Sequence, residues 1–129
     1  MNIKLYLVAL GVFLAMDMTW LLVIAKDLYA KHLGYLMSKT PNLVAAGIFY
    51  LLYVAGLVVF VLEPAIKNNS LVEALWRGAL FGLIAYATYD LTNLATIKDW
   101  PLLITIIDLI WGAVLSGSVA VVSYWLMRN

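Results

Sequence analysis

The chain has 129 residues, which is the size of one domain. Apolar residues make up 66% of it and the mean hydropathy is +1.01, whereas a soluble domain is nearer to half apolar, so the composition excludes an ordinary soluble fold. The net charge of +1 provides no basic surface for nucleic acid, and the absence of cysteine excludes structural disulfides, thiolate metal sites and cysteine nucleophiles.

Four apolar segments are each long enough to cross a bilayer, which takes about 20 residues in a helix. They cover residues 3–25, 43–62, 71–95 and 102–126. The first apolar run is longer than that of a typical signal peptide and no clear cleavage site follows it, so we expect it to be retained. The sequence therefore predicts an all-α membrane protein in which residues 1–129 form a single domain, an antiparallel bundle of four transmembrane helices.

The first connection, "KDLYAKHLGYLMSKTPN", is the longest. One helical face of it carries Leu28, His32, Tyr35 and Leu36. This pattern predicts a short interfacial helix on the membrane surface, which we expect the "TPN" segment to end. His32 is then an interfacial residue rather than a ligand.

The other two connections are short. In "EPAIKNNS", we expect Glu63-Pro64 to end the second span and Asn69-Ser70 to cap the third. The connection "IKDWP" is so short that the third and fourth helices must be antiparallel neighbours. Gly78 and Gly82 form a G-x-x-x-G pattern that lets backbones approach closely. We expect this contact between the third and fourth helices, with a homodimer through Gly78 and Gly82 as the alternative.

With four spans, both termini lie on the same side of the membrane. That side holds Lys4, Lys67, Arg77 and Arg128, and the other side holds Lys26, Lys31, Lys39 and Lys98. The positive-inside rule therefore gives no decision, and we favour termini in the cytoplasm. Trp76, Trp100 and Trp125 lie near span ends, as expected of an aromatic belt.

Three carboxylates, Asp17, Asp90 and Asp108, lie within the spans. Counting residues from the span ends at 1.5 Å each puts all three roughly 9–12 Å below the same membrane face. The second span has Tyr50 and Tyr53 at the matching depth. Ionisable residues are rare inside membranes and usually functional, so we predict a polar layer to which all four helices contribute.

Helical spacing of three and four residues extends this layer. The pattern D-x-x-W occurs twice, at Asp17-Trp20 and Asp108-Trp111, which predicts an indole N–H donor beside each carboxylate. The candidate residues of a ligand-binding or proton-handling site are Asp17, Asp90, Asp108, Asn93, Tyr50, Tyr53, Tyr86, Tyr89, Trp20, Trp111 and Thr105.

No Lys or Arg lies at the depth of the three aspartates. Ionised carboxylates close together in a low dielectric are unfavourable, so either some carry protons or a cation enters. All-oxygen ligation by Asp17, Asp90 and Asp108 would suit a hard divalent cation such as Mg²⁺, Ca²⁺ or Mn²⁺, or an organic ammonium. The plainer alternative is that these aspartates only hold the helices together by hydrogen bonds.

Four segments resemble a known family: "RGALFGLIAYATYDLTNLATIKDWP", "AKHLGYL", "DLIWG" and the D-x-x-W of the first helix. The family comprises small bacterial membrane proteins classed as a domain of unknown function, and the resemblance covers nearly the whole chain. It implies a four-helix, multi-pass protein of the bacterial inner membrane with no assigned catalytic residues. It also implies a genomic association with fatty-acid-modifying enzymes, and thereby a lipid-related role.

Three functions remain open. The polar layer favours a binding or transport protein that handles a proton, a cation or a small ligand. The alternatives are a membrane enzyme, or enzyme partner, in lipid or fatty-acid modification, and a structural or assembly protein. No H-E-x-x-H, nucleophile elbow or phosphate loop is present, so we lean against an enzyme without excluding one. The expected partners are the lipid bilayer and a small-molecule or lipid ligand.

Overall fold

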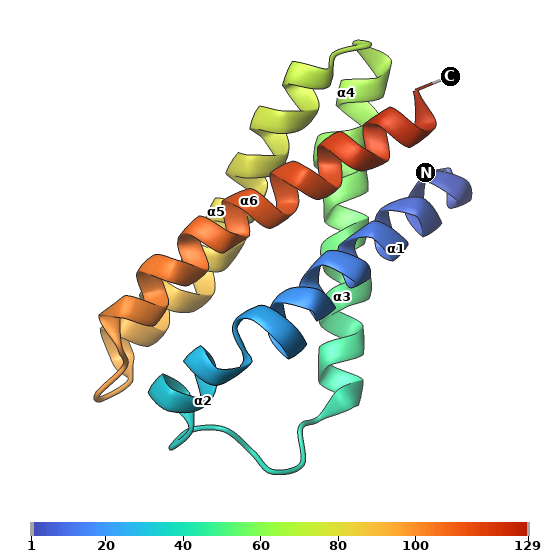
Figure 1. Cartoon of the computed structure of the whole chain (residues 1–129). Helices are drawn as coiled ribbons and strands as arrows, with labels where there is room; N and C mark the ends of the chain where they lie inside the picture. The colour runs from blue at the N-terminus through green and yellow to red at the C-terminus, as the bar shows by residue number, and fades with distance from the viewer. Residues whose placement is uncertain (1, 129) are drawn as a thin grey trace.

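A computed structural model describes residues 2–128, which form helices and no strand (Figure 1). Four helical segments are long and apolar enough to cross a membrane: Ile3–Ile24, Leu43–Lys67, Leu71–Thr96 and Leu102–Met127. The all-α fold with four spans is therefore confirmed. The two ends of the chain lie at the same end of the bundle (Figure 1).

The first two spans each contain a wider, π-helical turn. α1 (Ile3–Thr19) continues into η1 (Trp20–Ile24), and the short helix α2 (Lys26–Leu33) follows at the end of the bundle opposite the termini. The second span consists of α3 (Leu43–Leu57), η2 (Val58–Leu62) and α4 (Glu63–Lys67), and the last two spans are α5 (Leu71–Thr96) and α6 (Leu102–Met127). Asn2, Asn42 and Ser70 cap α1, α3 and α5 through side-chain oxygens, and the cap at Ser70 was predicted.

Large apolar side chains point outward along the spans. Val23, Ile48, Leu52 and Ile84 are each more than half exposed in the isolated chain. A water-soluble protein does not present continuous apolar surface of this kind, whereas a helix in lipid does.

The tightest contact in the bundle joins α5 and α6, which lie side by side (Figure 1). A Cβ atom on Gly78 would lie 2.7 Å from the Ser116 carbonyl oxygen, and one on Gly82 would lie 2.7 Å from the Ser116 Cβ. The glycines thus allow the two backbones to touch, as the G-x-x-x-G pattern predicts. In this structure α6 of the same chain occupies the face that carries Gly78 and Gly82, and a homodimer through these glycines stays an untested alternative.

α1 and α3 close the other side of the bundle. The buried ring of Phe13 on α1 packs against two tyrosines of α3, with centroid distances of 5.5 Å to Tyr50 and 5.2 Å to Tyr53. The Tyr6 hydroxyl donates to the Leu51 carbonyl oxygen at 2.9 Å and ties the same two helices nearer the termini.

The expected end of the second span at Glu63-Pro64 is wrong, because the helix continues to Lys67. Proline has no N–H and its ring clashes with the carbonyl four residues earlier. The π-helical turn η2 directly precedes Pro64, and there the Glu63 N–H donates to Val58. This wider turn accommodates the proline without ending the helix.

The first connection contains a helix, as predicted, but the helix is shorter than predicted, and its position at the membrane surface stays a prediction. It ends at Leu33 rather than at the "TPN" segment, so Tyr35 and Leu36 lie beyond it. Gly34, a weak helix former, follows directly, and the next N–H groups bond three residues back in turns. Beyond the helix, the Tyr35 hydroxyl donates to the Asp99 carbonyl oxygen at 2.6 Å and ties this connection to the turn between α5 and α6.

Candidate functional site

A pocket of about 470 Å³ lies at the end of the bundle opposite the termini, where α1, η1 and α2 face α3, α5 and α6. Seven of its lining residues were predicted as site residues: Asp17, Trp20, Tyr50, Tyr86, Tyr89, Asp108 and Trp111. Six were not predicted: Leu21, Tyr29, Leu33, Ala46, Phe49 and Ala85. The walls are therefore mainly aromatic and aliphatic, and the charged groups among these residues are two carboxylates.

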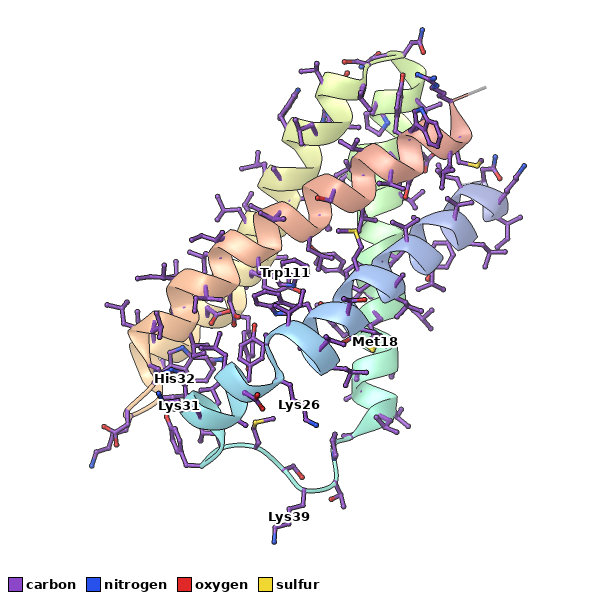
Figure 2. All side chains as sticks on the ribbon, viewed as in Figure 1. Met18, Lys26, Lys31, His32, Lys39 and Trp111 are labelled. Atoms are coloured by element: carbon purple, nitrogen blue, oxygen red, sulfur yellow. The ribbon has the colours of Figure 1, made fainter. Side chains whose placement is uncertain are left out.

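Two stacked indoles form one wall of the pocket. The rings of Trp20 on η1 and Trp111 on α6 lie 4.4 Å apart and within 12° of parallel. Figure 2 shows Trp111 projecting from α6 towards α1. The Trp111 N–H donates to a carboxylate of the other D-x-x-W pattern, whereas the Trp20 N–H reaches the other carboxylate only through the hydroxyl of Tyr29.

The Trp111 Nε1 donates to Asp17 Oδ1 across the two helices at 3.4 Å, and Asp17 is 4% exposed. The Trp20 Nε1 donates to the Tyr29 hydroxyl at 3.0 Å, and that hydroxyl donates to Asp108 Oδ1. The spacing predicted an indole donor beside each carboxylate, and in the structure neither indole donates to the carboxylate of its own D-x-x-W pattern. A carboxylate and an indole three residues apart share a face, but here each indole turns towards the neighbouring helix.

Tyr29 is the residue of this network that sequence reasoning missed. It lies on α2, outside the spans, and reaches back into the bundle to bond Asp108. Burial of the Tyr29 hydroxyl raises its pKa and the bond to Asp108 raises it further, so the phenol remains a neutral donor. The sequence carried only a weak signal for this role: Tyr29 is an aromatic residue in a helix that was expected to lie on the membrane surface.

Asp90 lies behind the pocket rather than in it. Its side chain is 0% exposed, and neither carboxylate oxygen accepts a hydrogen bond from the described residues. Its neighbour across the α5–α6 contact is the carboxyl group of Asp108. The predicted single layer therefore divides into an Asp17 side, a facing Asp108 side, and a fully buried Asp90.

Three further predicted site residues do not line the pocket. Tyr53 is buried and hydrogen-bonded to Ser116, and Thr105 accepts the Trp100 Nε1 at 3.0 Å. Asn93 is half-buried one turn beyond Asp90. Thr105 and Tyr53 have the correct depth, but the rotation of their helices directs them at other partners. Trp100, assigned above to an aromatic belt, is buried at 7% exposure.

Within residues 2–128, no group of three or more histidine, aspartate and glutamate side chains is close enough to hold a metal ion. A divalent cation bound jointly by Asp17, Asp90 and Asp108 does not fit this geometry. Asp17 and Asp108 accept hydrogen bonds from different donors, Trp111 and Tyr29, and Asp90 does not line the pocket.

Comparison with known proteins identifies the chain at the level of its family. A search of the curated proteins and a search of the solved structures found no match. The family model described as "Predicted membrane protein (DUF2177)" matches residues 2–125, which is nearly the whole chain. That family has no assigned function, in agreement with the resemblance found in the sequence. This chain is therefore a membrane protein that belongs to the DUF2177 family.

Proposed function

We propose that this protein binds a small organic cation, an amine or quaternary ammonium with an apolar body, in the pocket between its helices. The observation that carries the proposal is the composition of the pocket wall. Two carboxylates, Asp17 and Asp108, face a cavity whose other walls are aromatic and aliphatic, and no described lining residue is Lys, Arg or His.

The chemistry of these walls suits such a ligand in two ways. Aromatic faces attract a cation electrostatically, by about 0.5–2 kcal/mol each, and aromatic cages are a recurrent solution for quaternary ammonium groups. A carboxylate in a site of low dielectric provides the matching negative charge. The aliphatic side chains of Leu21, Leu33 and Ala85 would cover the apolar body of the ligand.

The size of the pocket limits the ligand. A volume of about 470 Å³ is in the usual range for a small-molecule site. A free organic cation and the headgroup of an amine-bearing lipid share the required chemistry, so the test must separate them. A transport role would use the same pocket.

The test uses the purified protein in nanodiscs of phosphatidylglycerol, which carries no amine. Binding of phenyltrimethylammonium is followed by the fluorescence of the pocket indoles. The loss of a buried counter-charge costs about 2 kcal/mol or more, so Asp17→Asn and Asp108→Asn should each weaken binding by about thirtyfold or more. The matched control is Asp99→Asn, an exposed loop residue with φ 63°, a backbone conformation that asparagine tolerates.

Two results would contradict the proposal. One is equally tight binding of tert-butylbenzene, which has the same shape without the charge. The other is cation binding that neither Asp17→Asn nor Asp108→Asn alters. Native mass spectrometry of protein from membranes containing phosphatidylethanolamine then distinguishes the sources, because a retained amine lipid that phenyltrimethylammonium displaces identifies the lipid headgroup as the ligand.

We also propose the bacterial inner membrane as the location, with the termini in the cytoplasm and the pocket end on the opposite side. The chain has no cysteine, so a single introduced cysteine is a clean reporter at Lys39, near the pocket end, or at Lys67, the last residue of α4 near the chain termini. In intact cells, a membrane-impermeant maleimide should label Lys39→Cys and leave Lys67→Cys unlabelled. The reverse pattern would overturn this orientation.

A further inference from the structure

Asp90 on α5 and Asp108 on α6 face each other across the tightest helix contact of the bundle, one turn beyond the point where Gly82 and Tyr86 lie against Gly112. Asp90 on α5 is 0% exposed, and Asp108 on α6 is 7% exposed and also lines the pocket. Asp108 accepts the Tyr29 hydroxyl, whereas both oxygens of Asp90 lack a donor among the described residues. A fully buried polar group without a partner is rare and calls for an explanation.

The two groups cannot both be ionised at an acceptable cost. Like charges in contact repel strongly in a low dielectric, and each ion also loses its hydration. The titratable groups that face the pair are the phenols of Tyr29, Tyr86 and Tyr89, with the Asp17 carboxyl farther off near Tyr86. None of these is a cation, so one member of the pair must carry a proton.

The hydrogen bonds decide which member that is. A donor that points at a carboxylate stabilises its ionised form, and Asp108 has such a donor in Tyr29, which Trp20 in turn orients. Asp90 has none, and a carboxylic acid in an apolar environment can stay neutral and donate its own hydrogen bond. A proton on Asp90 would also give the orphaned carboxyl group a partner, the facing Asp108.

We propose that Asp90 is the uncharged member of the pair, a protonated acid that donates to Asp108, and that Asp108 is the ionised member exposed to the pocket. Asp90 is then a positioning residue, because it and Tyr29 hold the Asp108 charge in place from two sides. The protonation of Asp90 stands on the geometry alone, whereas the use of the Asp108 charge to bind a cation rests on the proposed function.

The proton can be observed directly, without any ligand. Infrared spectroscopy of the protein in nanodiscs at neutral pH should show the C=O stretch of a protonated carboxyl group, and this band should shift in D₂O. The band should disappear in Asp90→Asn and persist in Asp17→Asn and Asp99→Asn. A band that survives Asp90→Asn, or a wild-type protein without one, would overturn the proposal.

Rescue by the conservative variant provides the second test. An asparagine amide at position 90 can donate to Asp108 as a protonated acid does, so Asp90→Asn should bind phenyltrimethylammonium within about threefold of wild type. Asp90→Leu has a similar volume but no donor, and should bind at least about tenfold more weakly. If Asp90→Asn loses binding as fully as Asp108→Asn does, the charge belongs to Asp90 and the assignment is wrong.

The two experiments separate the two proposals. If wild-type protein binds no organic cation but the carboxyl band is present and disappears in Asp90→Asn, the proposed function fails and the protonation of Asp90 stands. If the cation binds but the band is absent, the proposed function stands and the protonation of Asp90 fails.

Discussion

Removal of the Tyr29 hydroxyl tests how α2 is held against the bundle. α2 contributes no fully buried residue, so little apolar burial secures it. The Tyr29 hydroxyl connects α2 to the bundle by hydrogen bonds with Asp108 and Trp20. Farther along the connection, the Tyr35 hydroxyl donates to the Asp99 carbonyl oxygen. In Tyr29→Phe the ring remains and two hydrogen bonds are lost.

The free-energy cost of Tyr29→Phe follows from the loss of these two hydrogen bonds. A hydrogen bond to a charged group contributes about 1.5–3 kcal/mol and a neutral one about 0.5–1.5 kcal/mol. The half-buried Trp20 N–H borders the pocket and can regain water, so we expect a loss of about 2 kcal/mol. Because α2 is not part of the core, this loss should appear as local opening of residues 26–33 rather than as global unfolding.

The assay is amide hydrogen exchange by mass spectrometry in nanodiscs. A loss of about 2 kcal/mol predicts that the α2 amides exchange roughly thirtyfold faster in Tyr29→Phe. Tyr6→Phe removes another tyrosine hydroxyl bond, from α1 to Leu51, and should leave exchange in α2 unchanged. Unchanged exchange of α2 in Tyr29→Phe would show that the Tyr29 hydroxyl does not hold α2, and equal acceleration in Tyr6→Phe would show that the effect is not specific to Tyr29.

Three other predictions concern packing, a buried hydroxyl and pH. Gly82→Ala should lower the free energy of unfolding by about 1–3 kcal/mol or more, because the added Cβ would overlap α6. Gly11→Ala should not lower it, because nothing lies within 4 Å of a Cβ at that position. Equal free energies for the two variants in a denaturant titration would contradict the close contact of α5 with α6. Tyr53→Phe loses the hydrogen bond with Ser116 and should cost about 1 kcal/mol in the same titration, and a cost near zero would mean that the bond contributes nothing. Because the pKa of Tyr29 is raised in the folded protein, α2 should stay docked below the ordinary tyrosine pKa of 10.0 and should be released as the pH rises through the higher folded pKa. Hydrogen exchange of the α2 amides, corrected for intrinsic exchange, should therefore accelerate at high pH in wild type. An equal acceleration in Tyr29→Phe would contradict this.

The sequence was sufficient to predict the spans and the height in the bundle at which the pocket lies. Hydropathy located all four spans, and the glycine spacing predicted the contact of α5 with α6. Counting from the span ends brought Asp17 and Asp108 to one height, because a helix rises by a constant amount per residue. The pocket formed at that height, with both carboxylates in its wall.

The same counting could not give the rotation of each helix about its axis. Neighbouring residues of a helix differ by about 100° in direction, so equal depth does not imply a shared pocket. Asp90 therefore lies behind Asp108, and Thr105 bonds Trp100 instead of facing the cavity. Tyr29 was missed for a different reason, since periodicity within α2 does not reveal that its hydroxyl bonds Asp108 inside the bundle.

The most direct test of the central claim is the affinity of phenyltrimethylammonium for wild-type protein and for Asp108→Asn, measured side by side in phosphatidylglycerol nanodiscs. We expect saturable binding to wild type and at least about thirtyfold weaker binding to the variant. Binding of the same strength to both proteins would contradict it.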